Sequence, residues 1–257
     1  MSRRTAYPPG TFSWVELATS DGAAARRFYG GLFGWEIAAA GDGGVPAVCR
    51  LDGDAVCAIA EMPRGVRATG VPPSWTSHVT VPDTAAVARR AQALGGAVVA
   101  EPSPVPGAGT AAVLRDPQGA LVAVWQPDGW AGAERVNDPG CLCMNELITT
   151  DAAGARAFYG ALFGWEWDDV DAGDGAPVAF LRNDGAINGS VFAAAGPTPA
   201  HWRPCFTVPS VEEATARVRE LDGAVLHPGV LLPDGNLALV RDPQGAVLSL
   251  FAGETDP

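Results

Sequence analysis

The chain contains two copies of one long segment. Residues 14–36 read WVELATSDGAAARRFYGGLFGWE, and residues 144–166 read MNELITTDAAGARAFYGALFGWE, at an offset of 130 residues. A second matching pair follows, with LRDPQGALVAVW at 114–125 and VRDPQGAVLSLF at 240–251. Internal repetition constrains an architecture more strongly than any local motif does. Because the repeating unit is half of the 257 residues, the sequence predicts a duplicated domain and not a solenoid.

Each half divides further into two units of one pattern. A unit opens with a run of alternating polarity, which predicts a strand, and continues with a helix that begins at a capping side chain. Asp21 is the expected cap of the first helix, and Gly34 is its expected end. Ser210 and Glu213 form the spacing of a capping box at the start of the last helix. Three short strands, separated by Gly- and Asp-rich turns, complete each unit.

The sequence therefore predicts an α+β protein of four βαβββ units. We expect a first domain at 1–126, a linker at 127–140 (PDGWAGAERVNDPG) and a second domain at 141–257. The length suffices for two cores of ordinary size. The two halves are expected to superpose as pseudo-twofold copies.

Composition excludes several classes of partner. The formal net charge of −12 argues against nucleic acid and anionic membranes, which bind clustered positive charge. No apolar run is long enough to cross a membrane, and the N-terminal residues lack the apolar stretch of a secretory signal, so a cytoplasmic protein is expected. The chain has no lysine, which excludes Schiff-base chemistry. The five cysteines suggest no disulfide framework. A monomer and a homodimer both remain open.

The order of elements, the FY…LFGW segment after the first strand and the DPxG turn before the last resemble the vicinal oxygen chelate superfamily. This superfamily includes glyoxalase I, extradiol dioxygenases and bleomycin-type antibiotic-binding proteins. The resemblance implies two tandem domains whose mixed sheets curl into cups, with metal ligands on the first, fifth and last strands and on a middle strand near Cys57 and Gly189. In this chain the first, fifth and last positions carry Trp14, Ser77 and Ala123 in one half and Met144, Pro204 and Ser249 in the other.

These side chains do not make a metal site, because divalent ions need several imidazole, thiolate or carboxylate ligands. We therefore expect no bound metal and no cofactor. His78 is one residue beyond the fifth-strand position, so strand alternation turns it away from the cup unless a bulge restores it. His201 and His227 are expected at a cup edge and in a surface turn.

Strand alternation places Glu16 and Glu146 on the same faces as Trp14 and Met144. A carboxylate in an apolar cup has a raised pKa and could act as an acid or base, so both glutamates are candidate catalytic residues. Alternatively, each could bond backbone amides or an arginine and only brace its strand. The sequence leaves both possibilities open.

Large flat side chains on the predicted strands favour an aromatic ligand. The candidate ligand-binding residues of both cups are Trp14, Trp75, Ser77, Trp125, Met144, Trp202, Phe206, Ser249 and Phe251. Trp35 and Trp165 are expected in the core. The leading hypothesis is a protein that binds an aromatic or polycyclic natural product, for sequestration, resistance or assistance to a biosynthetic enzyme. One alternative is a metal-independent lyase, isomerase or cyclase that uses a cup glutamate; a second is a metal-dependent glyoxalase or dioxygenase.

Overall fold

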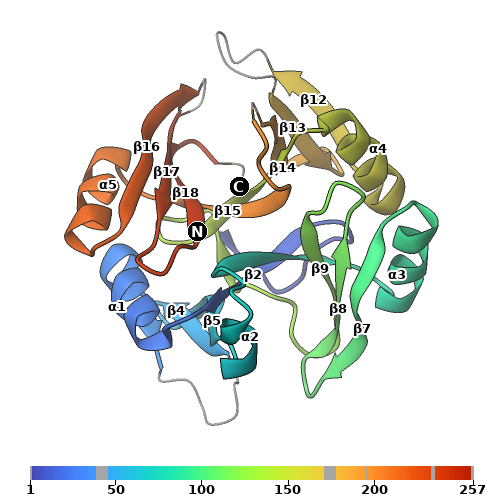
Figure 1. The fold of residues 1–257 in the computed structure, drawn as a ribbon, viewed down its shortest axis with the longest axis horizontal. Helices are drawn as coiled ribbons and strands as arrows, with labels where there is room; N and C mark the ends of the chain where they lie inside the picture. Colours follow the sequence, from blue (N-terminus) through green and yellow to red (C-terminus); the bar gives the residue numbers. More distant parts are fainter. Residues whose placement is uncertain (1, 39–45, 171–177, 195, 233–234, 256–257) are drawn as a thin grey trace.

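The computed structural model describes residues 2–38, 46–170, 178–194, 196–232 and 235–255, and it contains two eight-stranded mixed sheets (Figure 1). The strands of the first sheet, in spatial order, are β3 (Glu36–Ile37), β4 (Ala47–Leu51), β5 (Asp54–Glu61), β2 (Phe12–Thr19), β6 (Ser74–Thr80), β9 (Leu121–Pro127), β8 (Gly109–Arg115) and β7 (Ala97–Val105). Those of the second are β12 (Glu166–Val170), β13 (Val178–Asn183), β14 (Ala186–Ala193), β11 (Leu142–Thr149), β15 (His201–Thr207), β18 (Val247–Gly253), β17 (Gly235–Arg241) and β16 (Ala224–Leu232).

The two sheets have one topology. The opening strand of each half, β2 or β11, lies near the centre, where it pairs in parallel with β5 or β14 and antiparallel with β6 or β15. The sixth strand of the order, β9 or β18, then pairs in parallel with β6 or β15. The predicted α+β class and the four βαβββ units are confirmed.

Four long helices follow the opening strands of the four units: α1 (Gly22–Phe33), α3 (Thr84–Ala93), α4 (Ala152–Phe163) and α5 (Val211–Glu220). Each begins at a side chain that accepts a backbone N–H of the first turn, and the predicted caps Asp21 and Ser210 are among them. Gly34 ends α1 with φ 74°, a left-handed conformation that favours glycine. A short fifth helix, α2 (Arg64–Ala68), was not predicted. No helix in the described part of the chain is long and apolar enough to cross a membrane.

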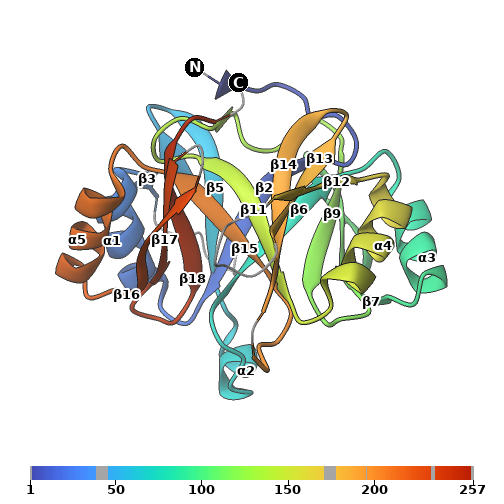
Figure 2. The same cartoon turned by 90° about the horizontal axis from the view of Figure 1, so that it is seen from above.

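Each of the two main cores is shared between the halves. One joins the first unit to the fourth, with Tyr29 and Trp35 packed together with Phe206 and Leu250. The other joins the second unit to the third, with Leu114 and Val122 packed with residues such as Tyr159 and Trp165. Accordingly α1 lies beside α5, and α3 lies beside α4 (Figures 1 and 2). Two cores were expected from the length, but sequence periodicity does not reveal that each half supplies part of both.

Two reciprocal hydrogen bonds cross between the halves inside these cores. The hydroxyl of Tyr29 donates to Asp242 Oδ2 at 3.0 Å, and that of Tyr159 donates to Asp116 Oδ2 at 2.9 Å. Each aspartate is the first residue of a DPQG turn and accepts backbone N–H groups of its own turn through Oδ1. Burial raises the pKa of both aspartates and of both tyrosines. The two repeated motifs therefore bind each other, with each copy bonded to the opposite half.

A second reciprocal pair lies just before the opening strands. The indole N–H of Trp35 donates to the Gly140 carbonyl at 2.8 Å, and that of Trp165 donates to the Gly10 carbonyl at 2.7 Å. Both tryptophans are buried, as predicted. A small sheet formed by β1 (Ser2–Arg3) and β10 (Arg135–Val136) then joins the N-terminal residues to the linker.

Replacing Tyr29 or Tyr159 with phenylalanine should lower the free energy of unfolding by about 1–3 kcal/mol, because each change leaves a buried carboxyl without one donor. The loss should be larger for Tyr159→Phe, since the Tyr159 hydroxyl also accepts the indole N–H of Trp202 at 2.8 Å. Urea denaturation measures both. Tyr7→Phe is the control, because its half-buried hydroxyl bonds only the Ala133 carbonyl and its loss should cost less. Equal, small losses in all three variants would contradict the role of the crossed bonds.

Candidate functional site: the two cup faces and a pocket between the halves

The face of each sheet that points away from the shared cores is called here its cup face. The first cup face carries Trp14, Glu16, Thr76, His78, Ala123 and Trp125. The second carries, at the matching places, Met144, Glu146, Arg203, Cys205, Ser249 and Phe251. Three neighbouring central strands supply each set, so the side chains of one set lie side by side. The two glutamates thus occupy equivalent positions on opposite halves.

A β-bulge decides which side chains share a face. Phe12 pairs with Val79, which would place Trp14 opposite Ser77, but the bulge between Phe12 and Trp14 shifts the register so that Trp14 pairs with His78. A matching bulge between Leu142 and Met144 sets Met144 opposite Cys205 rather than opposite Pro204. His78 therefore lies on the first cup face, contrary to the expectation from simple alternation.

Four of the predicted ligand-binding residues face the cores instead. Ser77 is fully buried at the junction of the halves, where its hydroxyl donates to Asn145 Oδ1 at 2.6 Å. The other three are aromatic and pack with core rings: Trp75 with Tyr29, Phe206 with Trp35, and Trp202 with Tyr159. Their expected place in the cups was wrong because the bulges reverse the facing of β6 and β15 relative to the start of β2 and β11.

The linker covers the tryptophans of the first cup face. The Trp130 ring lies 4.6 Å from that of Trp14 and 5.6 Å from that of Trp125, measured between centroids. The Trp130 carbonyl accepts the Trp125 indole N–H at 3.1 Å. Trp14 and Trp125 are only 5% and 4% exposed as a result. They lie on the predicted face, but Trp130 already occupies the surface that a planar ligand would need.

The two repeated glutamates have different surroundings. Glu146 is fully buried, and its Oε2 accepts from Arg203 Nε at 2.7 Å and from the Ser249 hydroxyl. Glu16 has Thr76 in the place of that arginine and Ala123 in the place of that serine. No hydrogen bond joins the Glu16 carboxyl to another described residue, and burial raises its pKa. Of the two roles that the sequence left open, Glu146 therefore has the structural one, because its carboxylate bonds an arginine. The Glu16 carboxylate has no such bond to a described residue.

Arg203 is the site residue that sequence reasoning missed. It is 8% exposed, and only its Nε is bonded; its two terminal nitrogens bond no side chain or carbonyl in the described ranges. Half-buried apolar side chains stand around it on the same face: Ile148, Phe180, Phe192 and Leu239. The available signal was an arginine inside the otherwise largely apolar run 201–207. Simple alternation from Pro204 would have turned it away from the cup, and the bulge before Met144 places it opposite Glu146.

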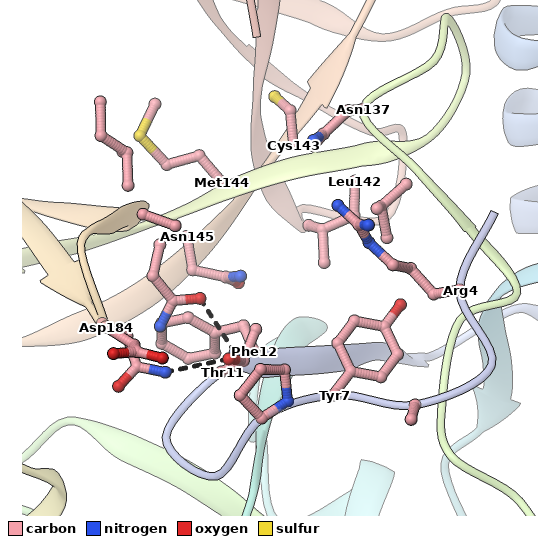
Figure 3. Close-up of a pocket in the computed structure, with 17 residues that line it drawn as sticks. Arg4, Tyr7, Thr11, Phe12, Asn137, Leu142, Cys143, Met144, Asn145 and Asp184 are labelled. Carbon is pink, nitrogen blue, oxygen red and sulfur yellow. Dashed lines mark hydrogen bonds between the residues drawn. The ribbon is translucent and has the colours of Figure 1, made fainter. Parts of the chain in front are cut away.

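A pocket of about 290 Å³ lies between the halves, at the start of β11 (Figure 3). The N-terminal segment, residues 4–12, forms one wall through Arg4, Tyr7 and Phe12. Residues 142–145 form the opposite wall, and the turn between β13 and β14 closes the side. Asn183 of β13 and Asn188 of β14 hold the segment in place by bonding the Pro9 and Gly10 carbonyls.

The residues at the family's ligand positions do not fit a metal ion. The matched cup-face sets are Trp14, His78 and Ala123 in one half and Met144, Cys205 and Ser249 in the other, and neither offers three imidazole, thiolate or carboxylate ligands. Across the part of the chain that the structure describes, no group of three or more His, Cys, Asp or Glu side chains is placed to hold a metal.

Comparisons with known proteins agree with this fold. Residues 11–124 match the family model described as the Glyoxalase/Bleomycin resistance protein/Dioxygenase superfamily. The chain is 35% identical to the Mycobacterium tuberculosis protein named "Putative glyoxylase CFP32", over 98% of both chains. The chain belongs to this superfamily. It is also 33% identical to "Anthracycline biosynthesis protein DauV" of a Streptomyces species, covering 96% of this chain and 94% of that protein.

Two solved structures of the superfamily show the same fold. A Mn(II)-bound glyoxalase from Novosphingobium aromaticivorans has a TM-score of 0.67 at 18% identity, covering 98% of this chain and 83% of that chain. A 2,2',3-trihydroxybiphenyl 1,2-dioxygenase from Sphingomonas wittichii has a TM-score of 0.69 at 17% identity, covering 96% and 92%. The tandem vicinal oxygen chelate architecture implied by the resemblance is confirmed.

The stability of the protein should fall on acidification between pH 6.5 and pH 4 through His78. Burial lowers the pKa of His78 from 6.5 to about 4, so in this window the unfolded chain takes up a proton that the folded protein does not. The loss can reach about 3 kcal/mol. Urea denaturation at pH 7 and at pH 4 gives the loss of unfolding free energy on acidification, which should be larger for the parent than for His78→Gln. His227→Gln, at an exposed site, is the control. Parallel curves for the parent and His78→Gln would refute the assignment.

Proposed function

We propose that this protein binds a small aromatic or polycyclic molecule on the second cup face, and that Arg203 holds an oxygen atom of that ligand. The observation that carries the proposal is Arg203, which is 8% exposed on a face of half-buried aromatic and aliphatic side chains and bonds only through Nε within the described residues. Its two terminal nitrogens are not among the enclosed atoms that lack a partner, so a ligand on this face can reach them. Phe180, Phe192 and Met144 supply apolar surface for a planar molecule.

The charge balance favours a neutral ligand oxygen. Glu146 already compensates the guanidinium, so a second anion would leave a buried site with net negative charge. A carbonyl oxygen accepts from the terminal nitrogens without that cost. The name of the related anthracycline biosynthesis protein supports a natural product as the ligand. The role would be sequestration, resistance or assistance to a biosynthetic enzyme.

The first half shows that the fold does not require Arg203. Thr76 occupies the equivalent position beside Glu16, and the first sheet has the same strand order. A buried arginine that the repeated architecture can omit is better explained by a ligand than by stability, since a buried ion pair adds little to stability.

Binding of 9-fluorenone and fluorene, two planar tricyclic probes that differ by one carbonyl oxygen, tests the proposal by equilibrium dialysis. The parent should bind fluorenone tighter by about tenfold to a hundredfold, because a hydrogen bond to a charged donor is worth about 1.5–3 kcal/mol. The double variant Arg203→Met/Glu146→Gln removes both charges together and should bind the two probes equally. Thr76→Met, at the matching place of the first half, should behave as the parent. Equal affinities in the parent would overturn the role of Arg203, and no binding of either probe would overturn the proposed function.

The unbraced Glu16 favours a second candidate, metal-independent acid–base catalysis on the first cup face. Glu16 and His78 are diagonal neighbours on adjacent strands, and burial raises the pKa of the first and lowers that of the second. A glutamate of raised pKa next to a neutral imidazole can exchange a proton with a ligand. Mass spectrometry of ligands after incubation with the protein tests for turnover. Turnover should vanish in Glu16→Gln and persist in Glu146→Gln; the opposite result would refute this assignment.

A further inference from the structure

The two repeats differ in polarity at the pocket between the halves. The places of Met144, Asn145 and Asn183 are taken in the first half by Trp14, Val15 and Leu51. Val15 is fully buried in a core, and Trp14 packs beneath Trp130. The first half is therefore packed with apolar side chains here, whereas the second half has asparagines and a pocket.

Asn145 carries a donor without a partner at this pocket. The residue is 1% exposed and lines the pocket; its Oδ1 accepts the Ser77 hydroxyl, while its Nδ2 has no hydrogen-bond partner among the described residues. Figure 3 shows its side chain extending from β11 toward the N-terminal segment. Leaving such a donor unpaired costs about 1–3 kcal/mol, so a partner from outside the chain is expected.

Two other amides of the wall, on Asn183 and Asn188, are occupied. Asn183 Nδ2 donates to the Pro9 carbonyl and to Thr11 Oγ1, and the amide of Asn188 bonds Gly10 and the Phe12 N–H. The Tyr7 hydroxyl donates to the Ala133 carbonyl. The remaining surface includes the apolar side chains of Phe12, Leu142 and Met144. The pocket thus combines an apolar wall with the unpaired donor of Asn145.

We propose that this pocket is a second binding site, for a small neutral molecule of one or two rings that carries a carbonyl oxygen, and that Asn145 Nδ2 donates to that oxygen. The volume of about 290 Å³ is at the lower end for small-molecule sites and suits a ligand of this size. The site shares Met144 with the second cup face, but Arg203, Glu146 and Ser249 do not line it, so the two proposed ligands have different hydrogen-bond donors. The N-terminal segment forms its wall, so a bound ligand also contacts both halves.

The test uses 1-indanone and indane, two bicyclic probes that differ by a carbonyl oxygen, with protein labelled with 15N at asparagine. In the parent, 1-indanone should shift the side-chain amide signal of Asn145 and bind about fivefold more tightly than indane, as expected for one neutral hydrogen bond. Asn145→Val introduces the residue of the first half and identifies the signal by its loss. That variant should bind both probes equally.

Two further variants keep the result decisive even if Asn145→Val is unstable. Ala186→Trp places a large side chain at an exposed position of the pocket wall and should abolish the shift of the Asn145 signal. Leu121→Trp adds the same side chain at an exposed position of the first half and should leave it unchanged. An Asn145 signal that 1-indanone does not move, or that still moves in Ala186→Trp, would overturn the proposal. Neither outcome bears on Arg203.

Discussion

The crossed bond between a helix tyrosine and a turn aspartate is the interaction on which this architecture depends. Tyr29 reaches Asp242 and Tyr159 reaches Asp116, so neither half completes its own core. The aspartate orders its DPQG turn and receives the hydroxyl with the same carboxyl group, which couples the local turn to the long-range contact. Both motifs are repeated in the sequence because each copy needs its partner in the other half.

This arrangement separates residues that build the fold from residues that are free to differ. Several large side chains of the shared cores match between the halves, as Phe28 and Phe158 or Trp35 and Trp165 do. The cup faces do not match: the position of Thr76 in the first half is taken by Arg203 in the second, and that of His78 by Cys205. The same glutamate consequently has a raised pKa in one half and an ion pair in the other. Chemistry has diverged on the faces that the core does not constrain.

The sequence predicted what local patterns control. Repeat spacing, the Asp21 cap and helix periodicity gave the units, because short-range rules act on neighbouring residues. The facing of Ser77 and the environment of Glu146 were not accessible, since a bulge of one residue and a pairing between distant strands decide them. Hydrophobic periodicity also could not show that each core is built from both halves. It indicates that one face of an element is buried, but not which element covers that face.

The reciprocal bonds carry a consequence for the history of the chain. Every contact made twice, such as Trp35 with Gly140 and Trp165 with Gly10, is one that two identical half-length chains could make with each other across a twofold axis. A symmetric pair of half-length ancestors would thus have possessed this interface before gene fusion joined them. Fusion preserved the contacts while releasing the two copies from identical sequence, and only afterwards could they come to differ, with Arg203 and Asn145 in one and Thr76 and Val15 in the other.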